Sequence, residues 1–398
     1  MISQEKAVIL RKGRARPFFG RHPWLFSGAV ASVKGSPSAG DQVTVRSHEG
    51  LFVAYGLYNL KSQIRVRLYS WDPDKPLTEV FLKKRLDDAL ALREAIPGLM
   101  DPEGACRLVF SESDGLSGIT VDRYGPYLAL QVTSLALSSR LDLLLDHLEH
   151  RLRPRGIYLR TERAVKDEEG LELKDGLLRG CLKAGSLLIE EEGARYEVDL
   201  REGQKTGFYL DQRENRKAAA RYAGGRTVLD LCCYSGGFFI SSMKAGAACA
   251  TGVDVSEAAL CLAEKNAAHN DVSPVSLVRS DVFGFLEGAL ARGESYGMII
   301  ADPPRFTHRK RSLEQALKGY LRLNELAVKL LTPGGILVTC SCSGHISRED
   351  FLSVLSQVSE RTGRPVRILE QRGQAPDHPV AASCPETSYL KCFICSVE

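Results

Sequence analysis

The sequence predicts an α/β protein whose last half carries a mostly parallel, seven-stranded sheet covered by helices on both faces. Three observations lead to this fold class. Strand-like runs alternate with helical stretches over the last 200 residues, which is typical of parallel sheets. The first 71 residues instead hold short strands separated by Gly, Pro, Ser and Asn, which indicates a small β-barrel. The chain of 398 residues is too long for one ordinary domain.

The element pattern predicts three domains, at residues 1–73, 74–190 and 191–398. In the first domain, strands are expected at 42–46, 52–57 and 64–69, and the Pro- and Asp-rich stretch Trp71 to Pro76 ends it. The central domain is a predicted α+β unit with helices near 77–96 and 138–152 and a strand at 157–161.

The third domain supplies the predicted sheet. Strands are expected at 227–231, 249–254, 275–278, 298–301, 336–340, 366–370 and 389–397. Helices are expected at 237–245, 256–270, 282–291, 313–331 and 349–361. Since no helix separates the last two strands, they are expected to form an antiparallel pair at one edge of the sheet.

Composition excludes several protein classes. The N-terminus has no apolar stretch typical of a signal peptide, and no run approaches the length of a membrane span. The 11 irregularly spaced cysteines favour reduced thiols and a cytoplasmic location. Cys392 and Cys395 lie in an apolar strand-like run and are expected in the core, so no metal site is predicted.

Positive charge is concentrated near the N-terminus. Residues 1–71 hold eleven basic and three acidic residues, a net charge of +8, so the other 327 residues sum to −4. Such a basic module favours a polyanionic partner, above all a nucleic acid, over a merely solvated surface. The candidate RNA-binding residues are Arg11, Lys12, Arg14, Arg16 and Arg21, together with the later basic run Arg309, Lys310 and Arg311.

Candidate cofactor-binding residues follow the predicted strands. In parallel sheets, ligands bind at the carboxyl ends of the strands. Gly236 and Gly237 follow the first strand and allow close approach of a ligand, but the turn lacks the dinucleotide-binding glycine pattern. Asp254 ends the second strand, where an acid binds a ribose, and Asp281 follows the third. Each aspartate could instead be an ordinary helix cap, as Ser256 is expected to be.

Two further residues at this edge are candidates for a direct part in the chemistry. Asp302 stands before two prolines that fix the backbone, so its carboxylate could bind an exocyclic amine or a protonated ring nitrogen. A rigid turn is the alternative. Cys342 ends the fifth strand beside a basic loop, which would favour a nucleophilic thiolate, although a buried inert cysteine is equally compatible with the sequence.

Several longer motifs occur in a fixed order along the chain. They are Arg21-His-Pro-Trp-Leu-Phe-Ser27, Glu112-Ser-Asp-Gly-Leu-Ser-Gly-Ile119, Gly203-Gln-Lys-Thr-Gly-Phe-Tyr-Leu-Asp-Gln-Arg213, Tyr234-Ser-Gly-Gly-Phe238, Asp302-Pro-Pro-Arg-Phe306, Ser341-Cys-Ser-Gly344 and Asp377-His-Pro-Val380. With them the chain resembles the ribosomal RNA large subunit methyltransferase I family. These are class I, Rossmann-like methyltransferases with an N-terminal PUA domain that make 5-methylcytosine in 23S rRNA. The departures are mild: Ser235 stands where Thr is usual and Arg305 where Lys is common.

The resemblance implies roles for individual residues. Cys342 would add to C6 of cytosine while Asp302 holds the N3/N4 edge. For the cofactor S-adenosylmethionine, the implied binding residues are Phe208, Asp211, Arg213, Tyr234, Ser235, Gly236, Gly237, Asp254, Asp281 and Asp302. The base that removes the C5 proton is unassigned, with Glu386 as a candidate. The implied partner is large-subunit ribosomal RNA, and a homodimer is compatible with the sequence.

Two alternatives remain open from the sequence. One is an RNA methyltransferase acting on a purine nitrogen, in which Cys342 is structural. The other is a non-catalytic RNA-binding assembly factor that keeps the methyltransferase fold as a scaffold.

Overall fold

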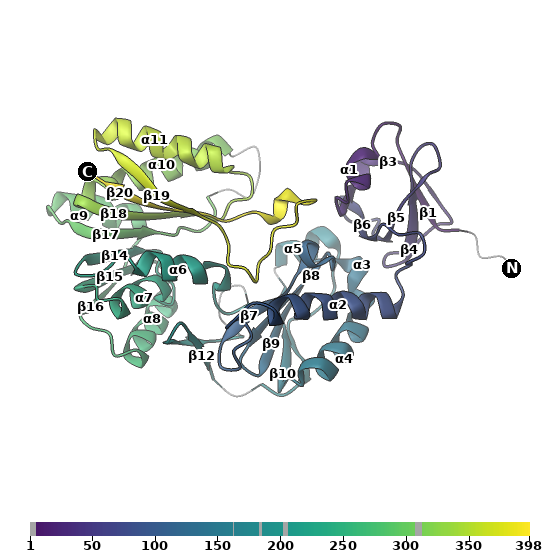
Figure 1. Ribbon diagram of the computed structural model, residues 1–398, viewed down its shortest axis with the longest axis horizontal. Coiled ribbons are helices and arrows are strands. Elements are labelled where there is room, and N and C mark those ends of the chain that lie inside the picture. Colours follow the sequence, from purple (N-terminus) through teal and green to yellow (C-terminus); the bar gives the residue numbers. More distant parts are fainter. Residues whose placement is uncertain (1–4, 162, 183–184, 202–205, 307–312) are drawn as a thin grey trace. The chain divides into compact units, whose positions relative to one another are not determined.

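The computed structural model describes residues 5–161, 163–182, 185–201, 206–306 and 313–398, which form two compact units (Figure 1). Unit 1 contains residues 1–187, 198–210 and 377–387. Unit 2 contains residues 188–197, 211–376 and 388–398. The chain therefore passes between the units several times, and the segment 377–387, between the last two strands, groups with unit 1.

Unit 1 begins with a six-stranded sheet in the order β2-β6-β5-β4-β1-β3. Its elements are β1 (Ala7–Leu10), α1 (Arg16–Phe19), β2 (Trp24–Phe26), β3 (Val30–Lys34), β4 (Gln42–Arg46), β5 (Phe52–Tyr58) and β6 (Ile64–Ser70). All pairs are antiparallel except β1 with β4. Alternate residues such as Val43, Val45 and Val66 face a shared apolar core, as the period of two in these strands requires.

A second sheet in unit 1 has the order β11-β10-β9-β8-β7. Its strands are β7 (Ala105–Phe110), β8 (Ile119–Tyr124), β9 (Tyr127–Val132), β10 (Gly156–Leu159) and β11 (Gly176–Gly180). The helices of this region are α2 (Glu79–Glu94), α3 (Leu135–Ser138), α4 (Leu141–Leu152) and α5 (Arg163–Glu169). Thr78 caps α2 by accepting a hydrogen bond from the Phe81 amide, and Leu82, Leu86 and Leu90 point into the core.

A buried ion-pair network joins the two sheets of unit 1. Arg67, on β6, is only 7% exposed and reaches Glu112 at 3.2 Å and Glu169 at 3.1 Å. Its guanidinium also donates to Ser117 and to the carbonyl of Thr133. A buried guanidinium needs such partners, because an unpaired charge away from water is strongly destabilising.

Unit 2 is built on a seven-stranded sheet in the order β16-β15-β14-β17-β18-β20-β19. The strands are β14 (Thr227–Leu231), β15 (Cys249–Asp254), β16 (Val275–Arg279), β17 (Tyr296–Ala301), β18 (Leu331–Ser341), β19 (Val366–Arg372) and β20 (Lys391–Val397). Only β20 runs antiparallel to its neighbours. The predicted mostly parallel sheet and its antiparallel edge pair are confirmed.

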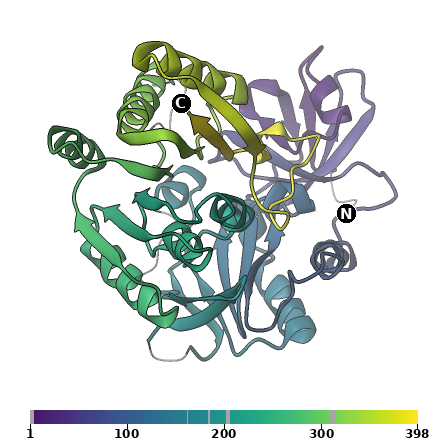
Figure 2. The same ribbon diagram turned by 60° about the vertical axis from the view of Figure 1, so that its left-hand side comes forward.

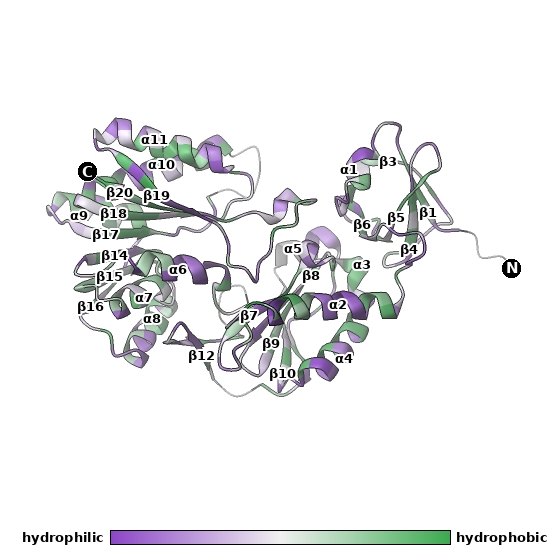
Figure 3. Cartoon of the chain, viewed as in Figure 1, coloured by the Kyte–Doolittle hydropathy of each residue, from purple (hydrophilic) through white to green (hydrophobic). Residues whose placement is uncertain are grey.

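Helices cover both faces of this sheet (Figures 1 and 2). They are α6 (Arg213–Ala220), α7 (Gly237–Lys244), α8 (Glu257–His269), α9 (Val282–Ala291), α10 (Leu313–Leu330) and α11 (Arg348–Thr362). Helices α9, α10 and α11 pack together on one face, and α6, α7 and α8 on the other. Strands β17 and β18 are largely hydrophobic, whereas α6 carries hydrophilic segments (Figure 3). Burial on both faces explains the near-continuous apolar runs in the central strands.

Two more strands, β12 (Leu187–Glu191) and β13 (Ala194–Val198), form a separate antiparallel pair. Of the three predicted domains, 1–73 and nearly all of 74–190 lie in unit 1. Within the predicted range 191–398, residues 198–210 and 377–387 also group with unit 1. Among the described helices, none is long and apolar enough to cross a membrane.

Candidate active site at the carboxyl edge of the seven-stranded sheet

The turn between β14 and α7 has an unusual backbone conformation. Cys232 (φ 60°), Tyr234 (φ 48°) and Gly236 (φ 85°) all adopt the left-handed conformation within five residues. Left-handed non-glycine residues are costly and gather at ligand-binding sites. At Gly236 a side chain is excluded as well, because a Cβ would lie 2.6 Å from the ring of Phe239. The sequence-predicted Tyr234, Ser235, Gly236 and Gly237 thus form one tightly wound turn.

Two aspartates hold this turn in place. The buried Asp230 accepts a hydrogen bond from the Phe239 amide at 3.1 Å. Asp254, at the end of β15, accepts from the Tyr234 amide at 3.0 Å and from the Ser256 amide at 2.9 Å. Since a carboxylate has about four acceptor positions, Asp254 keeps capacity for ligand hydroxyl groups.

Asp302 belongs to the same electrostatic environment. Burial, followed by the negative charges of Asp302 and Asp254, raises the pKa of the Asp230 carboxyl well above its ordinary value. Three carboxyl groups from adjacent strands therefore act on one another at this edge. Asp302 also accepts a hydrogen bond from the Gln212 side chain at 2.9 Å. Asn215 donates to Gln212 at 2.6 Å, which orients the amide toward Asp302.

Cys342 directly follows β18 and is half-buried. Its backbone carbonyl accepts from the Arg305 guanidinium at 3.1 Å. Lys391, which pairs with Ser341 across β18 and β20, extends its ammonium group to the carbonyl oxygens of Ser343 and of Tyr389. Lys391 is only 4% exposed, and burial lowers its pKa to about 8, against the opposing influence of Cys342.

The neighbouring cysteines have a different environment. Burial, reinforced by nearby aspartates, raises the pKa of Cys232 and of Cys233 well above the ordinary thiol value. A hydrogen bond with Cys392 and burial do the same for Cys340, and burial raises the pKa of Cys395 to about 12. These thiols are held in the neutral form, whereas Cys342 lies beside a cation. All eleven cysteines are thiols rather than disulfides.

Other predicted cofactor residues have structural partners. Asp281 caps α9 by accepting from the Gly284 amide at 2.9 Å, and Ser256 caps α8 as predicted. Asp211 accepts from the Tyr389 hydroxyl at 2.6 Å. Arg213 pairs with Glu191 at 3.3 Å. Phe208 is buried in unit 1, with its amide bonded to the Tyr124 hydroxyl at 3.1 Å. Roles of these residues toward a cofactor stay predictions.

The predicted RNA-binding residues of the N-terminal region are all exposed: Arg11, Lys12, Arg14, Arg16 and Arg21. The predicted Arg309, Lys310 and Arg311 lie outside the described residues. Two other residues of the first 71, Lys6 and Arg46, are paired with Asp41 and Glu5.

Glu386, the candidate base, lies in unit 1 with His22 and Cys384. Among the described residues, these three side chains form a cluster that could hold a metal ion. However, Nδ1 of His22 accepts a hydrogen bond from the Trp24 amide at 3.2 Å, which leaves the ring proton on Nε2. That nitrogen faces Glu386 at 3.3 Å. The hydrogen-bond pattern therefore favours a histidine–glutamate pair over a metal ligand.

Two residues were missed in the sequence analysis. Lys391 was detectable as a charge inside the apolar run from Leu390 to Val397. Gln212 lies in a recognised motif, but nothing in the sequence links it to Asp302, which is 90 residues away.

Comparison with known proteins identifies the group to which the chain belongs. Residues 8–71 match the PUA-like domain family, and residues 181–387 match the S-adenosylmethionine-dependent methyltransferase family. The chain is 41% identical, over 98% of its own length and 99% of the relative's, to "Ribosomal RNA large subunit methyltransferase I" of Escherichia coli O139:H28. The protein of that name from Shigella boydii serotype 4 gives the same values. The chain belongs to the ribosomal RNA large subunit methyltransferase I family.

Solved structures agree on the fold. A structure described as a methyltransferase complexed with SAH superposes with a TM-score of 0.85 at 21% identity, covering 98% of this chain and 99% of that one. Another, described as a SAM-dependent methyltransferase from Streptococcus mutans, gives 0.84 at 20% identity with the same coverage. Both comparisons show that this chain and the solved structures share a fold.

The cofactor of this methyltransferase is S-adenosylmethionine. The site fits it, because the wound turn at Gly236 brings backbone amides to the sheet edge and Asp254 retains acceptor capacity beside them. Tyr234, Ser235, Gly236 and Gly237 would hold the methionine part, and Asp254 the ribose.

Proposed function

We propose that this enzyme transfers a methyl group from S-adenosylmethionine to C5 of a cytosine in large-subunit ribosomal RNA, through a covalent adduct between Cys342 and C6. The observation that carries the proposal is that Asp302 and Cys342 lie at the same edge of the sheet. They follow the adjacent parallel strands β17 and β18, so both stand at the edge that carries the cofactor turn. The names of the relatives support ribosomal RNA as the substrate. Such a substrate also predicts a cytoplasmic location.

A nucleophilic residue is needed because C5 of cytosine is itself too weak a nucleophile to attack a methyl group directly. The Cys342 thiolate would form a bond to C6 and push the ring electrons toward C5. Asp302 would bind the N3/N4 edge and favour that addition. When bound, S-adenosylmethionine supplies the electrophilic methyl group that C5 takes up. A base then removes the C5 proton, and the S–C6 bond breaks to release the thiolate.

Lys391 would favour the thiolate form of Cys342. A thiol attacks only as the thiolate, and a positive charge nearby lowers the thiol pKa. The ammonium of Lys391 donates hydrogen bonds to the carbonyl oxygens of Ser343 and Tyr389, and these bonds fix its position beside Cys342. Arg305, held on the Cys342 carbonyl, adds a second positive charge.

The test is transfer from labelled S-adenosylmethionine to 23S rRNA that lacks the modification, followed by mass analysis of the nucleosides. Wild-type enzyme should produce 5-methylcytosine, and Cys342→Ala should lose turnover while still binding S-adenosylmethionine in calorimetry. Cys340→Ala, two residues earlier on β18, is the matched control and should stay active. A methylated purine, or full activity of Cys342→Ala, would overturn the proposal.

A further inference from the structure

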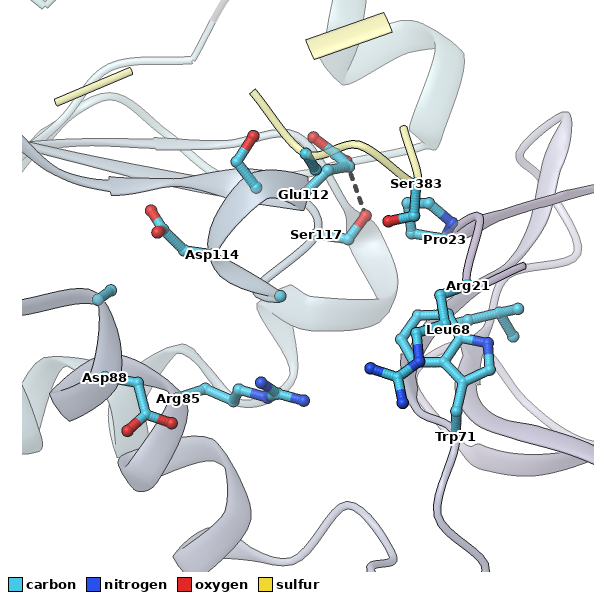
Figure 4. A pocket seen from close by; sticks show the side chains of 14 residues that line it. Arg21, Pro23, Leu68, Trp71, Arg85, Asp88, Glu112, Asp114, Ser117 and Ser383 are labelled. Carbon is cyan, nitrogen blue, oxygen red and sulfur yellow. Dashed lines mark hydrogen bonds between the residues drawn. The ribbon is translucent and has the colours of Figure 1, made fainter. Parts of the chain in front are cut away.

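Unit 1 contains a pocket of about 360 Å³ that no catalytic residue lines (Figure 4). Its walls come from the region of β2 and β6 in the PUA-like domain, from helix α2, from the turn η2 (Ser111–Asp114) and from the segment 377–387. The volume lies within the usual range for a site that holds a small ligand. Four separate parts of the chain are thus needed to form it.

Two arginines dominate the pocket. The guanidinium groups of Arg21 and Arg85 extend toward one another across its open space (Figure 4). No acidic side chain of the described residues forms an ion pair with either one. Arg85 donates to the carbonyl of Tyr69 at a long 3.4 Å, and its buried Nε has no hydrogen-bond partner among the described atoms. Two like charges that face each other repel, so an anion between them would be stabilised.

The acidic residues of the pocket wall do not neutralise these arginines. Each is paired with a base that does not line the pocket: Glu112 with Arg67 at 3.2 Å, Asp114 with Arg93 at 2.7 Å and Asp88 with Lys84 at 2.8 Å. Glu112 also accepts from Ser117 at 2.7 Å, the bond drawn in Figure 4. Among the side chains that the structure describes, none compensates the charges of Arg21 and Arg85 in the pocket.

The pocket is also held in shape. Arg21 has a left-handed backbone (φ 67°), which turns the chain just before β2. Arg85 lies over the ring of Phe81, with its guanidinium carbon 5.1 Å from the ring centre. The indole of Trp71 is fixed by a 2.7 Å hydrogen bond to the carbonyl of Phe18. A flat aromatic ring beside paired guanidinium groups is the usual chemistry of a nucleotide site.

We propose that this pocket binds one nucleotide of the RNA substrate, with its phosphate held between Arg21 and Arg85. The inference rests on the proposed action on RNA and adds a defined contact to it. Arg21 follows the exposed basic residues Arg11, Lys12, Arg14 and Arg16 in the same PUA-like domain, so a strand on that domain can place a phosphate in the pocket.

The test measures binding of a labelled single-stranded RNA of about twenty nucleotides to the full-length protein by fluorescence anisotropy, without S-adenosylmethionine. In Arg21→Asn with Arg85→Gln, affinity should fall about tenfold or more. The slope of log affinity against log salt should become shallower by about 0.7, the value for one lost phosphate contact on a single strand. Asparagine tolerates the left-handed backbone, and the exposed Arg21→Asn alone should show part of the effect without any threat to folding.

Matched controls separate this contact from a general loss of charge. Arg153→Asn replaces another exposed, left-handed arginine of unit 1 (φ 46°), and Lys83→Gln removes a charge from α2 outside the pocket. Both should keep nearly wild-type affinity. Unchanged RNA affinity and salt slope in the double variant would overturn the proposal. Loss of inorganic phosphate or AMP binding with unchanged RNA binding would also overturn it, in favour of a small-molecule site. Because methyl transfer is not scored, an error in the proposed cytosine chemistry cannot produce either result.

Discussion

Replacement of Lys391 by methionine tests whether Lys391 is a buried ammonium group with a lowered pKa. The Lys391 ammonium is 4% exposed, and burial lowers its pKa to about 8 from an ordinary value of 10.5. In the unfolded chain the pKa returns to the ordinary value. Between these two pKa values the unfolded state binds more protons than the folded state, so the free energy of unfolding rises with pH in this window.

The size of this effect follows from the shift. The fall in the pKa of Lys391 from 10.5 to about 8 corresponds to about 3.4 kcal/mol in the free energy of unfolding when the whole window between the two values is crossed. Between pH 7 and pH 9.5, the contribution of Lys391 to the free energy of unfolding should rise by about 2 kcal/mol. Lys391→Met cannot titrate, so the difference in free energy of unfolding between wild type and variant should change by that amount, in favour of wild type as pH rises.

The assay is urea unfolding of both proteins at several pH values across this range. Both proteins carry Cys342→Ala, because the Cys342 thiol is coupled to Lys391 and would titrate differently in the two. Titrating groups far from Lys391 are shared by both proteins and cancel in the difference. Lys318→Met is the control, since Lys318 is exposed on α10 and should follow wild type at every pH. A wild-type-minus-Lys391→Met difference that stays within about 0.5 kcal/mol over the whole range would refute the assignment of a buried, destabilised ammonium.

Three further predictions follow from the structure. Gly236→Ala should weaken S-adenosylmethionine binding by tenfold or more in calorimetry, because a Cβ at this position would collide with Phe239. The control is Gly246→Ala, since Gly246 has the same left-handed backbone (φ 89°) but open space around it; this variant should bind the cofactor normally. Asp254→Asn should lower the same affinity while the fold, monitored by circular dichroism, is kept; equal affinity would exclude Asp254 from ribose binding. Arg67→Met should destabilise unit 1 by about 3–5 kcal/mol in thermal unfolding, because the buried Glu169 and the largely buried Glu112 lose their cation. An unchanged melting temperature would contradict this.

The elements of unit 2 could be predicted from local sequence. Strand β14, strand β15 and helix α9 occupy the predicted residues, because hydrophobic periodicity and capping residues such as Ser256 act over a few positions. The position of the site followed from the same reasoning. Since parallel strands end at one edge, Asp254, Asp302 and Cys342 were expected there without any knowledge of tertiary contacts.

The sequence alone determined the α/β class, the basic N-terminal module, the glycine-rich turn and the cysteine expected to be reactive, since all of these are read from neighbouring residues. Tertiary structure decided which charges are compensated. Arg67, one of the eleven bases behind the +8 of the first 71 residues, is buried against two distant glutamates, whereas Arg21 remains exposed in a pocket beside Arg85. It also placed Lys391 next to Cys342. These pairings join residues far apart in the chain, and burial and distance, which set the strength of a charge, exist only after folding.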